Sequence, residues 1–110
     1  MVKDKEIRKI INQITEEIKR EYQPERIILF GSYAYGEPSS NSDLDLFIIK
    51  ETDKERRDRF VEVKRLVYDP KRNIVFSPLV YTPAEVEERL SLGDDFVNEI
   101  LEKGEMLYVR

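Results

Sequence analysis

Apolar residues recur along the first half of the chain in two distinct spacings, and these spacings predict its elements. Five isoleucines, at positions 7, 10, 11, 14 and 18, follow the three-four spacing of one helix face. This spacing predicts an amphipathic helix over residues 4–22 with Asp4 as its cap. Arg26–Phe30 is expected to be a strand, because residues 27–30 form a short apolar run. Leu44–Lys50 is a second such run, and because it is apolar directly after Asp45, it is expected to be a central strand.

The middle of the chain continues this alternation of helix and strand. A helix is expected from Thr52 to about Tyr68, with an apolar face made of Phe60, Val63, Leu66 and Val67. The cations on this helix are interpreted as a solvated surface or, alternatively, as a contact with a triphosphate, an acidic partner or RNA. A third strand is expected over Ile74–Tyr81, and Pro78 within it indicates a bulge or an edge position.

The last third of the chain predicts two short helices and a terminal strand. Thr82, Pro83 and Glu85 combine a helix cap, a first-turn proline and a capping box, and the helix that they begin is expected to end near Leu92. Residues 93–95 are expected to end this helix and to cap the next one, which covers residues 96–103. Residues 105–110 are expected to form the terminal strand. The whole order indicates one α/β (α+β) domain, residues 1–110, with a small mixed β-sheet flanked by helices.

Composition narrows the chemistry that this domain can perform. The 110 residues include neither cysteine nor histidine, which excludes disulfides, thiolate metal sites and histidine bases. A metal site would need oxygen ligands, and carboxylates combined with phosphate oxygens favour Mg²⁺ or Mn²⁺. The net charge of -4 argues against nucleic acid bound along a broad surface. No run of membrane-spanning length and no signal peptide is evident, so a cytoplasmic protein without a membrane contact is expected.

Two short motifs carry candidate chemistry. Gly31 and Ser32 follow the first strand directly, and such a turn allows close approach of a ligand and offers free amide groups to an anion. Asp43 and Asp45 lie on one face of the second strand, because strand side chains alternate. Each motif alone is also explained by an ordinary turn or by a solvated strand face. Together they indicate a metal–phosphate site, because adjacent carboxylates repel each other unless a cation or a proton separates them.

The segment between these motifs is expected to be a short helix at Ser32–Tyr35 followed by a loop over residues 36–42. Tyr33 and Tyr35 would either stack on a nucleobase or pack the short helix against its neighbours, and packing is the favoured interpretation. Ser42 is expected to hydrogen-bond the loop backbone rather than to take part in chemistry.

The spacing of these motifs resembles the signature of the nucleotidyltransferase superfamily related to DNA polymerase beta: Gly31-Ser32, ten residues, then Asp43-Leu44-Asp45. The longer strings, GSYAYG from Gly31 and SDLDL from Ser42, resemble the minimal nucleotidyltransferases (MNT proteins). These are small domains, many of them paired with a HEPN protein in toxin–antitoxin modules.

The resemblance implies the nucleotidyltransferase fold and a reaction that transfers a nucleoside monophosphate from a nucleotide, expected to be AMP from ATP. It assigns Gly31 and Ser32 to the triphosphate, and Asp43 and Asp45 to catalytic Mg²⁺ or Mn²⁺. The acceptor that it implies is a hydroxyl, such as a side chain of a HEPN-type toxin partner. A homo-oligomer is also compatible with the sequence.

One expected feature is missing from the sequence. The family places a third carboxylate on a later strand, but the third strand here contains no acid, and Ser77 stands where the acid is expected. A serine hydroxyl is a weak metal ligand and a poor proton acceptor at neutral pH. The acid could come from elsewhere, with Asp69 and Glu62 as candidates, or the protein could work with two carboxylates. A third possibility is an antitoxin-like module that binds its partner without efficient transfer.

Overall fold

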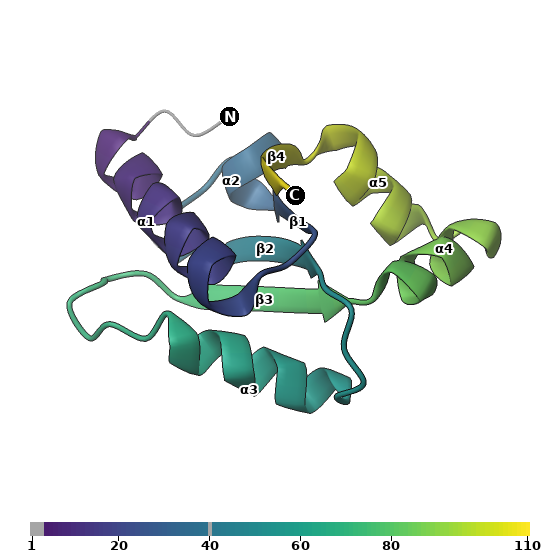
Figure 1. The fold of residues 1–110 in the computed structure, drawn as a ribbon. Helices are drawn as coiled ribbons and strands as arrows, with labels where there is room; N and C mark the ends of the chain where they lie inside the picture. Colours follow the sequence, from purple (N-terminus) through teal and green to yellow (C-terminus); the bar gives the residue numbers. More distant parts are fainter. Residues whose placement is uncertain (1–3, 40) are drawn as a thin grey trace.

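The computed structural model describes residues 4–39 and 41–110, and it shows a four-stranded mixed sheet with helices on both faces (Figure 1). The expected order of elements is confirmed. In chain order they are α1 (Lys5–Tyr22), β1 (Arg26–Phe30), α2 (Ser32–Tyr35), β2 (Leu44–Ile49), α3 (Arg56–Leu66), β3 (Phe76–Tyr81), α4 (Pro83–Ser91), α5 (Asp95–Lys103) and β4 (Glu105–Val109). Within the described part of the chain, no helix has the length and the apolar character needed to cross a membrane.

Strand β2 lies inside the sheet, whose order is β3-β2-β1-β4, so the prediction of a central second strand is confirmed. It pairs antiparallel with β1 and parallel with β3. Leu44, Leu46 and Ile48 point into a core that they share with α1 and α3. Phe47 and Ile49 point into a second core on the opposite face, which α4 and α5 cover. Because side chains alternate along a strand, Asp45 lies on the same face as Phe47.

Local signals in the sequence placed most helix ends correctly. Asp4 caps α1 by accepting hydrogen bonds from the amides of Glu6 and Ile7, at 2.8 and 3.3 Å. Thr82 and Glu85 form the expected capping box of α4, in which each side chain accepts from the other residue's amide. Strand β3 is an edge strand, as Pro78 indicated. The expected loop before β2 is also observed, although its residue Ser40 lies outside the described residues.

The prediction for α3 was wrong in its start and, at Phe60, in its buried face. The other predicted positions, Val63, Leu66 and Val67, do pack into the core. The helix begins at Arg56 rather than at Thr52, and Phe60 is 41% exposed, whereas Arg59 is only 6% exposed. The physical reason is that the Arg59 guanidinium finds partners inside the protein. It donates to the carbonyl oxygens of Lys54 and Val80 and to both carboxylate oxygens of Glu85, at 2.7 to 3.3 Å. The pattern of apolar positions assigns an arginine to the surface, so it did not predict that Arg59 is buried and Phe60 is exposed.

We expect Glu85→Gln to lower the free energy of unfolding by about 2 kcal/mol, since the buried Arg59 guanidinium loses its counter-charge. Burial opposes ionisation of Glu85, but hydrogen bonds from Arg59 and from the Thr82 amide outweigh it and lower its pKa. This stabilisation is therefore present above the unfolded pKa of about 4.5 and is lost as pH falls through the lower folded value.

Urea unfolding at pH 7 and again below pH 4.5 checks this expectation, with Glu87→Gln, an exposed change on the same helix, as the control. The difference between wild type and Glu85→Gln should shrink in acid. A difference that stays constant with pH would contradict the role assigned to the ion pair.

Candidate active site

The turn between β1 and α2 requires glycine at its first position. Gly31 has φ 76° and ψ -155°, a conformation that L-residues with a β-carbon rarely adopt. A β-carbon built on Gly31 would also collide with the carboxylate of Asp45. The backbone of the turn and the side chain of β2 therefore touch at this point, so the two sequence motifs meet in one place.

Gly36 closes the same turn at the end of α2. Its amide donates to the carbonyl oxygen of Ser32 at 3.2 Å, and a β-carbon there would lie 2.8 Å from the Ser32 α-carbon. Tyr33 is buried in the core below α1, which confirms the packing interpretation for that residue, whereas Tyr35 is 36% exposed. The Ser42 hydroxyl accepts from the Ser39 amide at 2.8 Å, which confirms its expected role in the loop.

The two aspartates lie at the start of β2, beside Ser77 of the neighbouring strand. Asp43 is exposed, and Asp45 is half-buried between its register partners, Phe30 on β1 and Ser77 on β3. The Ser77 hydroxyl donates to Oδ2 of Asp43 at 3.3 Å. The structure thus brings Gly31, both aspartates and Ser77 together on the sheet face that α4 and α5 partly cover.

The electrostatics of this cluster favour a cation. Burial raises the pKa of Asp45, and the negative charge of Asp43 raises it further. Across residues 4–39 and 41–110, no lysine or arginine forms an ion pair with either aspartate. Two carboxylates without a basic neighbour create a local negative potential that a divalent cation would neutralise.

The donor set fits Mg²⁺ or Mn²⁺. Mg²⁺ in proteins is commonly bound by one or two carboxylates, with water and substrate phosphates completing its octahedron. Asp43 and Asp45 supply the carboxylates, and the Gly31 backbone lies directly beside the Asp45 carboxylate. No cluster of three acidic, histidine or cysteine side chains suited to a metal occurs in the described part of the chain. The protein therefore offers a partial ligand set that phosphates would complete.

Neither alternative acid joins the cluster. Glu62 lies on α3, which covers the opposite face of the sheet, and it pairs with Lys54 at 2.8 Å. Asp69 accepts a hydrogen bond from the Lys71 amide at 2.9 Å within the turn that follows α3. Ser77 lies beside Asp43 and Asp45 on the neighbouring strand, so the cluster has two carboxylates and a hydroxyl.

Sequence reasoning assigned no role to Phe96, which the structure places beside this cluster. The Phe96 ring packs edge-on against Phe30, the residue that precedes Gly31 and is paired with Asp45. No periodicity could reveal this contact, because Phe96 lies on a different helix, 66 positions along the chain.

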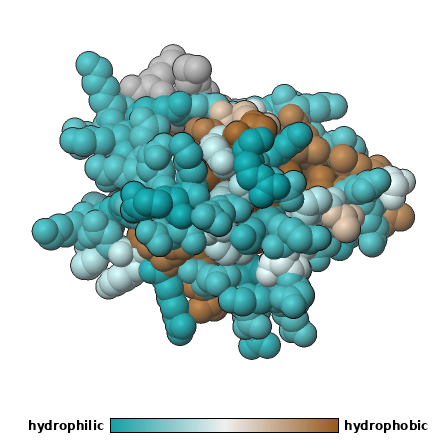
Figure 2. All heavy atoms as spheres, in the orientation of Figure 1, coloured by the Kyte–Doolittle hydropathy of each residue, from teal (hydrophilic) through white to brown (hydrophobic). Residues whose placement is uncertain are grey.

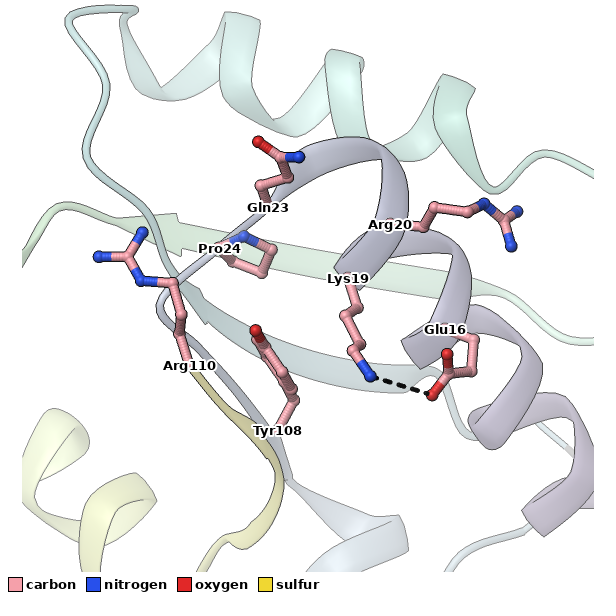
Figure 3. Close-up of a pocket in the computed structure, with 7 residues that line it drawn as sticks. All are labelled: Glu16, Lys19, Arg20, Gln23, Pro24, Tyr108 and Arg110. Carbon is pink, nitrogen blue, oxygen red and sulfur yellow. Dashed lines mark ion pairs between the residues drawn. The ribbon is translucent and has the colours of Figure 1, made fainter.

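A separate cavity of about 570 Å³ lies at the other end of β1, near the end of α1 (Figure 3). Its lining residues are Glu16, Lys19, Arg20, Gln23, Pro24, Tyr108 and Arg110. Lys19 pairs with Glu16 at 3.9 Å, and Arg110 pairs with Glu25 at the same distance. Because its cations are matched by carboxylates, this cavity is a weaker candidate for phosphate than the turn at Gly31.

The fold and the site together define a nucleotidyltransferase domain. The family model described as "Nucleotidyltransferase domain" matches residues 11–107, which include both motifs, and the chain belongs to this family. The chemistry of the family is nucleotidyl transfer.

Two individual proteins add detail to this assignment. The chain is 40% identical over 43 residues to "Putative protein adenylyltransferase MJ1215" of Methanocaldococcus jannaschii. That match covers 39% of this chain, and the chain spans only about half (50%) of the length of that relative. A Sulfolobus solfataricus protein described as a "putative nucleotidyltransferase" has a similar structure, with a TM-score of 0.63 over 93% of this chain and 79% of the other. At 19% identity, this likeness shows the shared fold alone.

We expect Gly31→Ala to lower the free energy of unfolding by about 3 kcal/mol, since it combines an unfavourable φ with a collision against Asp45. Gly93→Ala is the matched control. Gly93 also has a positive φ, of 72°, but a β-carbon there would meet no neighbouring atom within 4 Å. The Gly93→Ala variant should therefore lower the free energy of unfolding by only about 1 kcal/mol. Equal losses for the two variants in chemical denaturation would show that the Asp45 contact adds nothing.

We also expect Asp45→Asn to raise the melting temperature at pH 7 in EDTA. Because its folded pKa is raised, Asp45 contributes stability that is fully present below its unfolded pKa of about 3.8 and is lost as pH rises through the folded value. Asparagine does not ionise, so the advantage of the variant should grow between about pH 4 and pH 7. Asp53→Asn, at an exposed position after β2, is the control, and a variant less stable than wild type throughout that range would contradict the expectation.

Proposed function

We propose that this protein transfers a nucleoside monophosphate, AMP from ATP, to a hydroxyl group on a partner protein, with Mg²⁺ or Mn²⁺ as cofactor. The observation that carries the proposal is the meeting of Gly31, Asp43 and Asp45 at one end of the sheet. The name of the curated relative, a protein adenylyltransferase, supports AMP as the transferred group and a protein as the acceptor.

Each residue of the site has a distinct task in this proposal. The backbone at Gly31 binds the phosphates together with Ser32. Asp43 and Asp45 hold the metal ion, which supplies charge neutralisation for the phosphates. The acceptor hydroxyl attacks the α-phosphorus and releases its proton to solvent, while the bond from the α-phosphorus to the bridging oxygen breaks and pyrophosphate leaves. Ser77, through its hydrogen bond, orients the Asp43 carboxylate.

The acceptor that we propose is a side chain of a HEPN-type toxin partner in the cytoplasm. Support for it comes from the resemblance of the Gly31–Gly36 and Ser42–Leu46 strings to the minimal nucleotidyltransferases. Modification of the partner would be the means by which the protein acts as an antitoxin.

A second candidate function follows from Ser77. Among the described residues, no third carboxylate joins the cluster to accept the proton of the acceptor hydroxyl or to bind metal. The alternative is therefore a nucleotide-binding antitoxin module that neutralises its partner by binding, with weak transfer or none.

A transfer assay separates these candidates. The readout is radiolabel from α-labelled ATP on a co-expressed HEPN-type protein, with Mg²⁺ present. We expect Asp43→Asn to abolish labelling, because one of two metal-binding carboxylates is lost, and Ser77→Asp to increase it about tenfold or more, because a third carboxylate is restored. Ser77→Ala controls for the loss of the hydroxyl.

Labelling retained in both Asp43→Asn and Asp45→Asn would refute transfer at this site. If wild type gives no label with any of the four NTPs, while an Asp43/Asp45 double variant still neutralises and co-purifies with the partner, the binding module is the correct function.

A further inference from the structure

Phe96 is a large aromatic residue at the surface, and its ring contacts the ring of Phe30. It lies in the first turn of α5 and is 48% exposed, whereas Val97 and Ile100 of the same helix are fully buried. Its ring meets Phe30 edge-on, with centroids 5.8 Å apart and planes at 85°. Phe30 in turn meets the buried Phe47 ring at 6.4 Å and 84°. The exposed ring of Phe96 is therefore the outer end of a row of four rings, formed by Phe96, Phe30, Phe47 and Tyr81.

This row of rings begins beside the candidate active site. Phe30 precedes Gly31 and is the register partner of Asp45, and side chains of directly paired residues share one face with β-carbons about 5 Å apart. The Asp45 carboxylate in turn touches Gly31. The Phe30 ring therefore lies between Phe96 and the Asp45 side chain, and all three are on the same face of the sheet. Figure 2 shows hydrophobic residues gathered over the region of α5.

We propose that the exposed ring of Phe96 stacks on the base of a nucleotide whose phosphates bind at Gly31 and Ser32. The inference rests on the proposed function, because it uses the same phosphate site. A nucleobase presents a flat apolar face, and stacking of a base on an aromatic side chain stabilises binding by about 1–3 kcal/mol. The row of rings holds Phe96 in position before the nucleotide arrives.

Charge at this end of α5 favours the base over the phosphates. Asp94 caps the helix by accepting from the Val97 amide at 3.1 Å, and Asp95 beside it is exposed. These two carboxylates repel phosphate, whereas a neutral base approaches them without electrostatic cost. The nucleotide is therefore oriented with its phosphates at the turn and its base at α5. Because stacking tolerates any base, we expect all four NTPs to bind, with purines tighter than pyrimidines owing to their larger rings.

A single tryptophan reports on this contact directly. The natural chain contains no tryptophan, so Phe96→Trp introduces one fluorophore at the proposed platform. Mg²⁺–ATP should quench its fluorescence, whereas Mg²⁺ with inorganic tripolyphosphate, which lacks a base, should not. Leu92→Trp is the matched control, because Leu92 is 69% exposed between α4 and α5 and has no ring contact. Its fluorescence should not respond to either ligand.

Affinities measured by calorimetry complete the test. Phe96→Leu keeps an apolar side chain but removes the aromatic face, and it should raise the Kd of Mg²⁺–ATP about tenfold while leaving that of tripolyphosphate unchanged. Phe96→Tyr should restore ATP binding. Thermal unfolding checks that the variants are folded.

Several outcomes would overturn the proposal. Unchanged ATP affinity in Phe96→Leu, equal weakening for ATP and tripolyphosphate, or no quenching in Phe96→Trp would each show that the base binds elsewhere, with Tyr35 of α2 as an alternative surface. These results leave the proposed function standing if Asp43→Asn still weakens both ligands. If wild type binds neither ligand, the proposed function fails as well.

Discussion

Strand β2 is buried on both faces, and this constraint positions everything at the site. Leu44, Leu46 and Ile48 contact one core, and Phe47 and Ile49 contact the other. A shift of one residue in register would therefore exchange the two sets between the faces. The register fixed in this way places Asp45 opposite Phe30 and Ser77. Gly31 follows β1 directly, and because it has no side chain, its backbone can lie against the Asp45 carboxylate. Geometry at the surface is therefore a consequence of packing in the interior.

The same packing sets a conflict between stability and chemistry at the start of β2. Half-burial of Asp45 beside Asp43 opposes its ionisation, and the described part of the chain provides no cation to relieve this. At Arg59, by contrast, the protein surrounds a buried charge with four hydrogen bonds, including both oxygens of Glu85. The charge of Arg59 is compensated within the protein, as in a structural ion pair. The charge of Asp45 is not, which is typical of a binding site.

Much of this architecture could be predicted from the sequence, because strong local signals agree with the tertiary structure. The isoleucine spacing in α1, the cap at Asp4 and the capping box at Thr82 each describe interactions between residues that are close in sequence. The candidate site was predictable for the same reason: Gly31 and Asp45 belong to two short motifs on adjacent strands. The position of Ser77 followed from counting back from a helix start.

What could not be predicted depends on partners that are distant in sequence. Arg59 is buried because it pairs with Glu85, a residue 26 positions further along the chain. With Arg59 facing inward, the neighbouring Phe60 lies at the surface. The contact between the rings of Phe30 and Phe96 depends on how α5 packs on the sheet, and no local sequence pattern predicts this packing.

The location of Ser77 has a consequence for how such a protein changes over evolutionary time. It lies on β3, an edge strand, and its side chain is only partly buried at the mouth of the site. A serine and an aspartate are close in size, so this position can exchange one for the other without disturbing either core. Under the proposed function, catalytic strength is thereby separated from folding: a change at this one position of an edge strand would alter transfer while both cores stay intact.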